Sequence, residues 1–365
     1  MWGLITVVEA QNTAINEDYP YYSASIHSSN FMTKKRRSRL SPQEYIDGIL
    51  AHNPFILSRA ITLIESQLES DNELATQIID QLMPHTGKSV RVGITGIPGV
   101  GKSTFIETFG LYLAELEKQN KKVAVLAIDP SSQRSGGSIL GDKTRMEKLS
   151  NHKNAYIRPS PARSSLGGVA QKTRETMLLC EAAGFDVILI ETVGVGQSET
   201  IVKGMVDFFL LLMLAGAGDE LQGIKRGIME MADMLVITKA DGENKKQATR
   251  AKSQYKHALH LFPPNEANWI VPVEICSALE NNGIADIWTT IESYVHQTAE
   301  NGFFSKNRSE QNKQWLHQTI EEHLKRDFYK NESIKNQLSK LEQQVASGNR
   351  NAVEVAKELL KKYYT

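Results

Sequence analysis

Short apolar runs alternate with helical patterns through the middle of the chain. Seven runs are rich in Val, Ile and Leu, and they are Val90 to Thr95, Val123 to Ile128, Ala155 to Ile157, Val187 to Ile190, Phe208 to Leu214, Met234 to Thr238 and Ile270 to Ile275. Continuous apolar strands joined by helical crossovers are typical of a parallel sheet that is covered on both faces. The pattern therefore predicts an α/β fold with a mainly parallel sheet flanked by helices.

Helical patterns without strands precede and follow this region. Ser41, Pro42 and Glu44 have the spacing of a capping box at a helix start. Apolar residues then recur with helical periodicity up to Leu82, and again in three stretches after Gly302. The final helices have no core of their own, so they must pack within the chain or form a dimer arm, and their pattern leaves both possibilities open.

These patterns divide the chain into four expected parts. They are an irregular tail or extension over residues 1–31, an N-terminal helical arm over 32–87, a central α/β domain over 88–302 and a C-terminal helical arm over 303–365.

A glycine-rich motif follows the first predicted strand and opens the next helix. Its form, G-x-x-x-x-G-K-[ST], is that of a phosphate loop, whose backbone N–H groups surround phosphate oxygens. Lysine reaches the outer phosphates, and the serine hydroxyl is a ligand for magnesium. The predicted phosphate-binding residues are Gly96, Ile97, Pro98, Gly99, Val100, Gly101, Lys102, Ser103 and Thr104.

Acidic residues occur where other predicted strands or loops reach the same edge of the sheet. Asp129 follows the strand that ends at Ile128, Glu191 follows the strand that ends at Ile190, and Asp142 lies in a glycine-rich loop. Magnesium prefers hard oxygen ligands such as hydroxyl and carboxylate groups. We therefore expect Asp129 and Glu191 to join Ser103 at a magnesium nucleotide, with Asp142 as a weaker candidate on spacing alone.

The choice of base is indicated by two further strand ends. Lys239 and Asp241 follow one strand, and Ser277, Ala278 and Leu279 follow another. A carboxylate such as that of Asp241 can accept hydrogen bonds from the N1–H and the exocyclic amine of guanine, groups that adenine does not offer in that arrangement. The stem of Lys239 can cover the ring. These motifs favour GTP and GDP over adenine nucleotides.

The composition of the chain bears on three other classes of function: nucleic-acid binding, membrane insertion and metal binding by cysteine. The chain has 365 residues, with 42 basic and 42 acidic side chains, so the overall charge gives no reason to expect a nucleic-acid partner. No run approaches the roughly 20 apolar residues of a membrane span. Cys180 and Cys276 have no partner at metal-ligand spacing, and we expect reduced thiols and a cytoplasmic location.

Taken together, the motifs resemble those of the MeaB/ArgK GTPases, relatives of the methylmalonic aciduria type A protein within the G3E class of P-loop GTPases. The similarity runs from about Met32 to the C-terminus. It is densest in Val92 to Thr104, Ala127 to Ser132, Arg158 to Pro161, Leu166 to Val169, Glu191 to Gln197 and Ala215 to Gly227.

This resemblance implies a magnesium site formed by Ser103, Asp129, Asp142 and Glu191. It also implies a third switch within residues 215–227. The residues to which it assigns catalysis or switching are Lys102, Asp142, Glu191, Asp219, Gln222 and Lys225. One departure concerns Thr238, where many GTPases have Asn, so its contact with the base and the loop is expected to be weaker.

The family's activity supplies the expected function. The resemblance implies a homodimeric GTPase that loads and protects adenosylcobalamin-dependent methylmalonyl-CoA mutase. A nickel-insertion GTPase of the same class would need His or Cys ligands near the switches, and a P-loop kinase would need an acceptor pocket with a general base. A purely helical scaffold would not need the phosphate loop.

Overall fold

The computed structural model describes the chain in seven stretches, residues 39–116, 120–128, 146–159, 166–192, 198–216, 226–263 and 265–364. The chain divides into two units, Met1–Arg39 and Leu40–Thr365. Every helix and strand among the described residues lies in the second unit.

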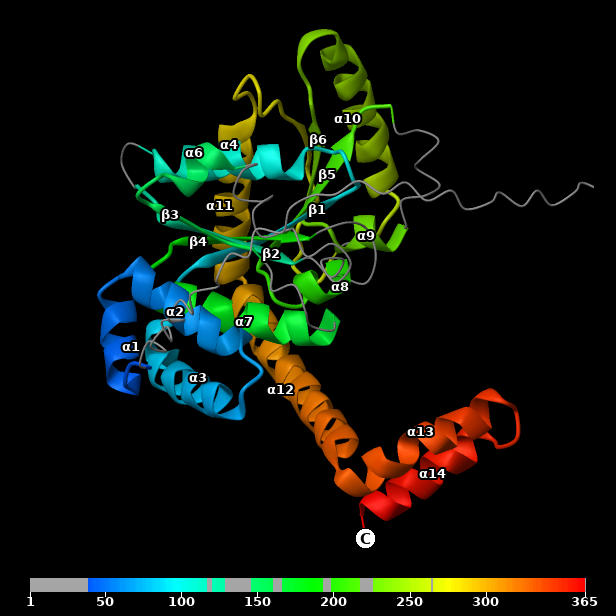
Figure 1. Ribbon diagram of the computed structural model, residues 1–365. Helices are drawn as coiled ribbons and strands as arrows, with labels where there is room; N and C mark the ends of the chain where they lie inside the picture. The colour runs from blue at the N-terminus through cyan, green and yellow to red at the C-terminus, as the bar shows by residue number, and fades with distance from the viewer. Residues whose placement is uncertain are drawn as a thin grey trace, which may run out of the picture. The chain divides into compact units, whose positions relative to one another are not determined.

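A seven-stranded parallel sheet forms the centre of this unit (Figure 1). Its strands are β1 (Val90–Gly96), β2 (Val123–Ile128), β3 (Ala155–Arg158), β4 (Val187–Thr192), β5 (Phe208–Leu214), β6 (Met234–Thr238) and β7 (Val273–Ile275). Their order is β3-β2-β4-β1-β5-β6-β7, and every pair of neighbours runs parallel. The expected α/β fold with a parallel sheet flanked by helices is thus confirmed.

The seventh strand is shorter than the apolar run predicts. Ile270 is 83% exposed, and the strand begins only at Val273. Pro272 explains this difference, because proline has no N–H to donate to a ladder and is disfavoured inside a strand. Its carbonyl oxygen still accepts a hydrogen bond from the N–H of Leu235 in β6, at 3.0 Å.

Helices cover both faces of the sheet because alternate strand residues point in opposite directions. One face, which includes Phe208 and Leu210, packs against α4 (Lys102–Ala114), α6 (Glu147–Ser150) and α11 (Ile284–Glu300). The other face, which includes Phe209 and Leu211, packs against α7 (Leu166–Ala182), α8 (Ser198–Lys203), α9 (Arg226–Met231) and α10 (Lys245–Leu259). Short 3-10 turns occur at Met83–His85 and Gly242–Asn244.

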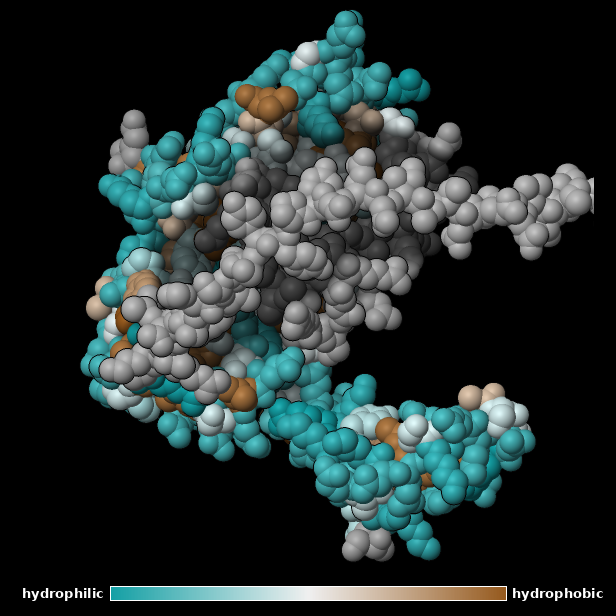
Figure 2. Space-filling model, viewed as in Figure 1, coloured by the Kyte–Doolittle hydropathy of each residue, from teal (hydrophilic) through white to brown (hydrophobic). Residues whose placement is uncertain are grey.

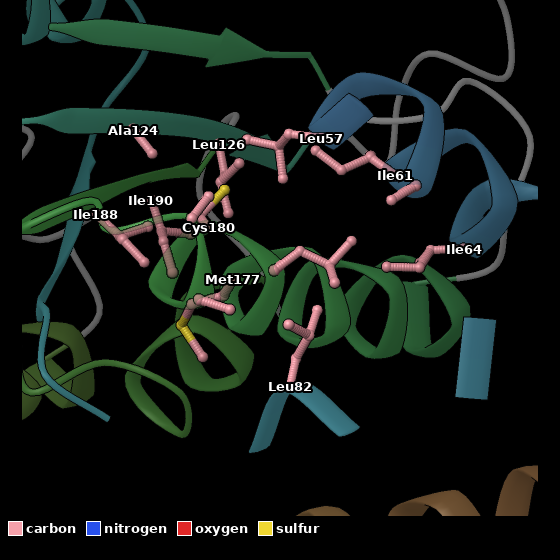
Figure 3. Packing of buried hydrophobic residues seen from close by; sticks show 14 of the residues in the cluster. Leu57, Ile61, Ile64, Leu82, Ala124, Leu126, Met177, Cys180, Ile188 and Ile190 are labelled. Atoms are coloured by element: carbon pink, nitrogen blue, oxygen red, sulfur yellow. The ribbon is translucent and has the colours of Figure 1, made fainter. Parts of the chain in front are cut away.

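Three N-terminal helices extend the second face. They are α1 (Pro42–Leu50), α2 (Pro54–Glu65) and α3 (Glu69–Leu82), and α1 begins with the predicted capping box at Ser41. Figure 3 shows Leu57, Ile61 and Ile64 of α2 beside α7, with sheet residues reaching the same apolar layer. Arg158 at the end of β3 forms an ion pair with Glu65 at the end of α2. The amphipathic faces of these helices are therefore buried within the unit.

The long helix α12 (Phe303–Lys330) is fastened to the sheet by buried charges. Arg308 donates to both carboxylate oxygens of Asp207 at 2.7 Å, and to the carbonyl oxygens of Gly87 and Ser89 at 2.6 Å. Asp207 also accepts the backbone N–H of Arg91 at 2.8 Å. Because several charge-assisted hydrogen bonds meet at one guanidinium, this end of α12 is held in a defined place.

The last two helices pack mainly on each other. They are α13 (Glu332–Ala346) and α14 (Ala352–Tyr363), and their small core contains Ile334, Leu341, Val355 and Leu359. Phe328 near the end of α12 packs against the same core.

Candidate functional site

The phosphate loop connects β1 to α4, and its glycines are required by the backbone. A Cβ atom at Gly96 would lie 2.5 Å from the carbonyl oxygen of Leu212 in β5, which is closer than any side chain can approach. Gly101 has a φ of +94° immediately before α4, a conformation that favours glycine. The first N–H groups of a helix have no partner within it and can bind an anion. The loop is therefore built to receive phosphate.

Lys102 lies at the first position of α4 and folds back over the loop. Its Nζ donates to the carbonyl oxygens of Gly96 at 2.7 Å and Ile97 at 3.3 Å. Burial lowers the pKa of Lys102, and the carboxylates of Glu191 and Glu199 oppose that shift. The lysine therefore stands as a partly buried cation at the mouth of the loop, where phosphate oxygens can replace the two carbonyl acceptors.

Ser103 and Glu191 are brought together by the sheet. Glu191 lies in β4, which extends beyond the predicted end at Ile190 and reaches Thr192. In the register of the sheet it lies opposite Ile94 of β1, close to where the phosphate loop begins. The Ser103 hydroxyl donates to the Glu191 carboxylate over 3.4 Å. One hydroxyl and one carboxylate are hard oxygen donors, so this pair fits a magnesium ion in the chemistry of its ligands.

Several sequence-predicted residues lie outside the described part of the chain. They are Asp129, Asp142, Asp219, Gln222 and Lys225. Within the described residues no group of three His, Cys, Asp or Glu side chains could hold a metal ion. The two remaining predicted carboxylate ligands thus stay predictions, as do the three residues of the third switch.

The two segments predicted to bind the base, residues 239–241 and 277–279, contact each other, and Lys239 contacts the phosphate loop. The Ser277 hydroxyl donates to Oδ2 of Asp241 at 2.8 Å, and the N–H of Ala240 donates to the carbonyl oxygen of Cys276 at 3.0 Å. Nζ of Lys239 donates to the carbonyl oxygen of Gly99 at 2.8 Å. The structure thereby brings the predicted base-binding carboxylate and lysine to the edge of the phosphate loop.

Ala278 and Leu279, which follow Ser277, lie at the same edge of the sheet. The carbonyl oxygen of Ala278 accepts a hydrogen bond from Thr108 of α4 at 3.2 Å, which ties the second base loop to the helix after the phosphate loop. Leu279 is 81% exposed, so its side chain is available to lie along a bound base. A cavity of about 470 Å³ lies beside these residues and includes Glu107, Tyr112 and Asn281 in its lining. Neither Lys102 nor Asp241 lines this cavity, so it is a neighbour of the nucleotide site.

Thr238 makes a direct contact with the phosphate loop in spite of its departure from Asn. Its hydroxyl is within hydrogen-bond distance of the carbonyl oxygen of Val100, at 2.7 Å, and of that of Met213, at 3.2 Å. The side chain is buried. A hydroxyl can thus connect the base loop to the phosphate loop, although the sequence comparison with Asn predicts a weaker contact.

Replacing Thr238 with valine is expected to weaken GTP binding about tenfold, because a net hydrogen bond between buried groups contributes about 1–1.5 kcal/mol. Valine keeps the shape but leaves the Val100 carbonyl oxygen without this donor. Thr238→Ser retains the hydroxyl and should bind GTP nearly as the unaltered chain does. Isothermal titration with GTP compares the three proteins, and equal affinity of the valine variant would contradict this role.

Glu199 belongs to the site although the motifs do not indicate it. It lies in the first turn of α8, its side chain is completely buried, and its charge acts on Lys102. In the sequence it has the form of an ordinary acid at a helix start. Only the packing of α8 against β1 and β4 places it near the phosphate loop.

No helix in the described part of the chain is both long and apolar enough to cross a membrane.

Comparisons with known proteins agree with this geometry. A family model described as "Methylmalonyl Co-A mutase-associated GTPase MeaB" matches residues 57–333. A probable GTPase of Mycobacterium tuberculosis is 49% identical over 304 residues, which are 83% of this chain and 90% of that protein. The GTPase ArgK of Escherichia coli is 48% identical over 278 residues, 76% of this chain and 83% of its own length.

A mitochondrial relative and a solved structure extend the comparison. The methylmalonic aciduria type A homolog of Mus musculus is 44% identical over 335 residues, which cover 88% of this chain and 80% of that protein. A crystal structure titled as a LAO/AO transport system kinase has a TM-score of 0.70 and 36% identity, and the match covers 90% of this chain and all of that one. The range of the family model, residues 57–333, includes the phosphate loop and all seven strands of the sheet.

Proposed function

The chain belongs to the family of methylmalonyl-CoA mutase-associated GTPases and is a GTP hydrolase, and from this premise we propose that it is a chaperone for an adenosylcobalamin-dependent methylmalonyl-CoA mutase. In this role it controls loading of the mutase with its cofactor and protects the mutase from inactivation. GTP hydrolysis sets the timing. The observation that carries the proposal is the family match over residues 57–333, which includes the phosphate loop and all of α12.

The proposed roles of the site residues combine the geometry of the described residues with the family resemblance. The phosphate loop holds the nucleotide, Lys102 neutralises charge on the outer phosphates, and Ser103 with Glu191 would hold magnesium together with Asp129 and Asp142. A bound magnesium ion would supply further neutralisation of the β- and γ-phosphates. Phosphoryl transfer needs positioning and charge stabilisation more than covalent chemistry from the protein, so these residues suffice for slow hydrolysis.

Switching follows from the difference between GTP and GDP. Only GTP offers a γ-phosphate, so segments that contact it have different preferred positions in the two states. The proposed switch residues are Asp142, Glu191, Asp219, Gln222 and Lys225, of which the last three form the candidate link to the mutase.

The C-terminal helices support a homodimer. Leu316, Ile320 and Leu324 recur every four residues along α12, so they form one stripe on that helix. They are 60%, 46% and 59% exposed. Figure 2 shows a mainly hydrophilic surface over α13 and α14, with a few hydrophobic residues exposed among them. An apolar stripe on an otherwise polar helix is typical of an interface, and we propose a second copy of this chain as its partner.

The double variant Ile320→Asp and Leu324→Asp is expected to be a monomer of about 40.7 kDa, whereas the unaltered chain should have twice that mass. Two carboxylates in an apolar interface must be desolvated without partners, which opposes association. Light scattering after size-exclusion chromatography measures the mass. Lys325→Asp adds the same side chain beside the stripe and should leave the dimer intact. A dimeric double variant would show that the stripe is not the interface.

The chaperone role is tested with the mutase from the same organism. Affinity capture is carried out with GDP and with a non-hydrolysable GTP analogue, and Lys102→Ala serves as the variant that cannot respond to nucleotide. We expect a complex whose yield differs between the two nucleotides in the unaltered chain and not in the variant. If no nucleotide-dependent complex forms, the chain is a GTPase with a different client.

A further inference from the structure

The segment from the last residue of α8 to β5, residues 203–207 (the 203–207 turn), is held by side chains from two other helices. Nε2 of Gln311 in α12 donates to the carbonyl oxygen of Val206 at 2.8 Å. Nη2 of Arg174 in α7 donates to the carbonyl oxygen of Gly204 at 3.1 Å, and its Nη1 donates to Oε1 of Gln318 in α12 at 2.8 Å. The end of α8 is therefore joined directly to α12 at Gln311, and through Arg174 of α7 to Gln318, about two turns further along α12.

Another face of α8 packs on the two strands that lead to the phosphate site, β1 and β4. A Cβ atom at Gly93 of β1 would lie 2.8 Å from Cγ1 of Val202, so α8 packs tightly on the strand that leads into the phosphate loop. The side chain of Glu199 in the first turn of α8 is buried, and β4 carries Glu191 at the phosphate site. A displacement of α8 caused by a change at the phosphates would therefore be carried to the 203–207 turn and to α12.

The contact with α12 contains polar groups that are left unmatched. Among the described residues, Oε1 of Gln311 has no donor and Nε1 of Trp315 has no acceptor, although both atoms are buried. The two residues are one helical turn apart, so they lie on the same face of α12. Each unmatched buried group costs about 1–3 kcal/mol. Because unmatched buried groups of this kind are costly, they favour a second arrangement of this contact in which both atoms have partners.

Arg174 and a cavity show the same incomplete fit. Arg174 is 5% exposed, and within the described residues it forms no ion pair. Its guanidinium donates to the neutral groups of Gly204 and Gln318 and lies 6.0 Å from the centre of the Trp315 ring. Burial lowers its pKa. A cavity of about 190 Å³ is lined by Arg174, Ile201, Trp315 and Gln318, among others. Space beside Trp315 allows the indole to move when α8 and α12 shift.

Arg308 fixes one end of α12, so a shift of this helix would be confined to the part that follows it. It lies one turn before Gln311 on α12 and is fully engaged by Asp207 and two carbonyl oxygens. The helix is thus anchored at Arg308 and loosely matched from Gln311 onward. A firm anchor beside an adjustable contact is the arrangement of a hinge.

We propose that the contact of the 203–207 turn and α7 with Gln311 and Trp315 of α12 is a nucleotide-sensitive joint, through which the phosphate site changes the position of the C-terminal helices. The joint rests on the proposed role of the chain as a nucleotide switch, and it adds a route that is separate from the third-switch residues 219–225. Gln311 and Arg174 are positioning residues in this joint, and Trp315 reports its state.

Tryptophan fluorescence tests the joint in the isolated full chain, without the mutase. Emission is recorded with GDP and with a non-hydrolysable GTP analogue, in magnesium buffer, for the unaltered chain and for Trp315→Phe. We expect the two nucleotides to give different emission in the unaltered chain, and the difference to be lost in Trp315→Phe. A difference that persists in Trp315→Phe, or no difference at all, would overturn the proposal.

Gln311→Ala should lose the nucleotide-dependent change while its affinity for both nucleotides stays within about twofold of the unaltered value. Gln314→Ala is the matched control, since Gln314 is an exposed residue of the same type on the same helix. An unchanged response in Gln311→Ala would also contradict the joint. If Gln311→Ala does not fold, the comparison of the unaltered chain with Trp315→Phe still decides.

The outcome is separable from that of the chaperone experiment. If Trp315 emission is the same with both nucleotides and the mutase complex depends on the nucleotide, the joint is excluded and the chaperone role is retained. If Trp315 emission differs between the nucleotides and no mutase complex forms, the joint is supported and the mutase is excluded as the client.

Discussion

Replacing Lys102 with alanine is expected to lower GTP hydrolysis at least about a thousandfold and to abolish measurable nucleotide binding at micromolar concentrations. The structure places this ammonium group at the mouth of the phosphate loop, within hydrogen-bond distance of Gly96 and Ile97. Alanine leaves the charge that develops on the β- and γ-phosphates without its partner. It also leaves the carboxylates of Glu191 and Glu199 without the cation that they face.

Phosphate release from GTP and titration with a fluorescent GTP analogue measure both effects. Lys246→Ala is the matched control, because Lys246 is an exposed lysine on α10 and its loss should change neither quantity. A circular dichroism spectrum like that of the unaltered chain shows that the variant is folded. Hydrolysis at the unaltered rate would mean that phosphate is bound elsewhere.

The strands and the phosphate loop were predictable because each is encoded within one short stretch. Val123–Ile128, Phe208–Leu214 and Met234–Thr238 are strands with the predicted bounds. Apart from Thr238 at the end of β6 they are apolar, as is typical of strands buried on both faces. The convergence of Ser103 with Glu191 and of Lys239 with the phosphate loop also follows, since the carboxyl ends of parallel strands meet at one edge. The predicted start of the last strand at Ile270 was wrong, because Pro272 is disfavoured inside a strand and β7 begins at Val273.

The contacts between distant segments could not be predicted in the same way. Arg91 pairs with Glu181, which is 90 residues away, and Arg308 pairs with Asp207 over 101 residues. An arginine or an acid in a helical pattern has the appearance of a solvated surface residue until the packing of that helix is known. For this reason the sequence does not indicate a role for Glu199 or Gln311. Both side chains are buried beside the segments that carry the proposed function.

Asp241→Asn is expected to weaken GTP binding about a hundredfold and to allow xanthosine triphosphate to bind instead. An aspartate accepts two hydrogen bonds from the N1–H and the exocyclic amine of guanine, and charge-assisted bonds of this kind contribute about 1.5–3 kcal/mol each. The Ser277 hydroxyl donates to Oδ2 of Asp241 at 2.8 Å, which fixes the carboxyl group in one orientation. Asparagine has nearly the same shape, so that orientation can persist while one acceptor becomes a donor.

Xanthine has a carbonyl oxygen where guanine has the amine, and this oxygen can accept from the new amide. Competition between the two nucleotides for a fluorescent analogue measures the exchange of preference. Asp286→Asn, an exposed aspartate in α11, should retain the preference for GTP. Because the base loops contact the phosphate loop without contributing Lys102 or Ser103, the variant should hydrolyse saturating xanthosine triphosphate at close to the unaltered rate with GTP. Unchanged affinity for GTP would instead place the base away from Asp241.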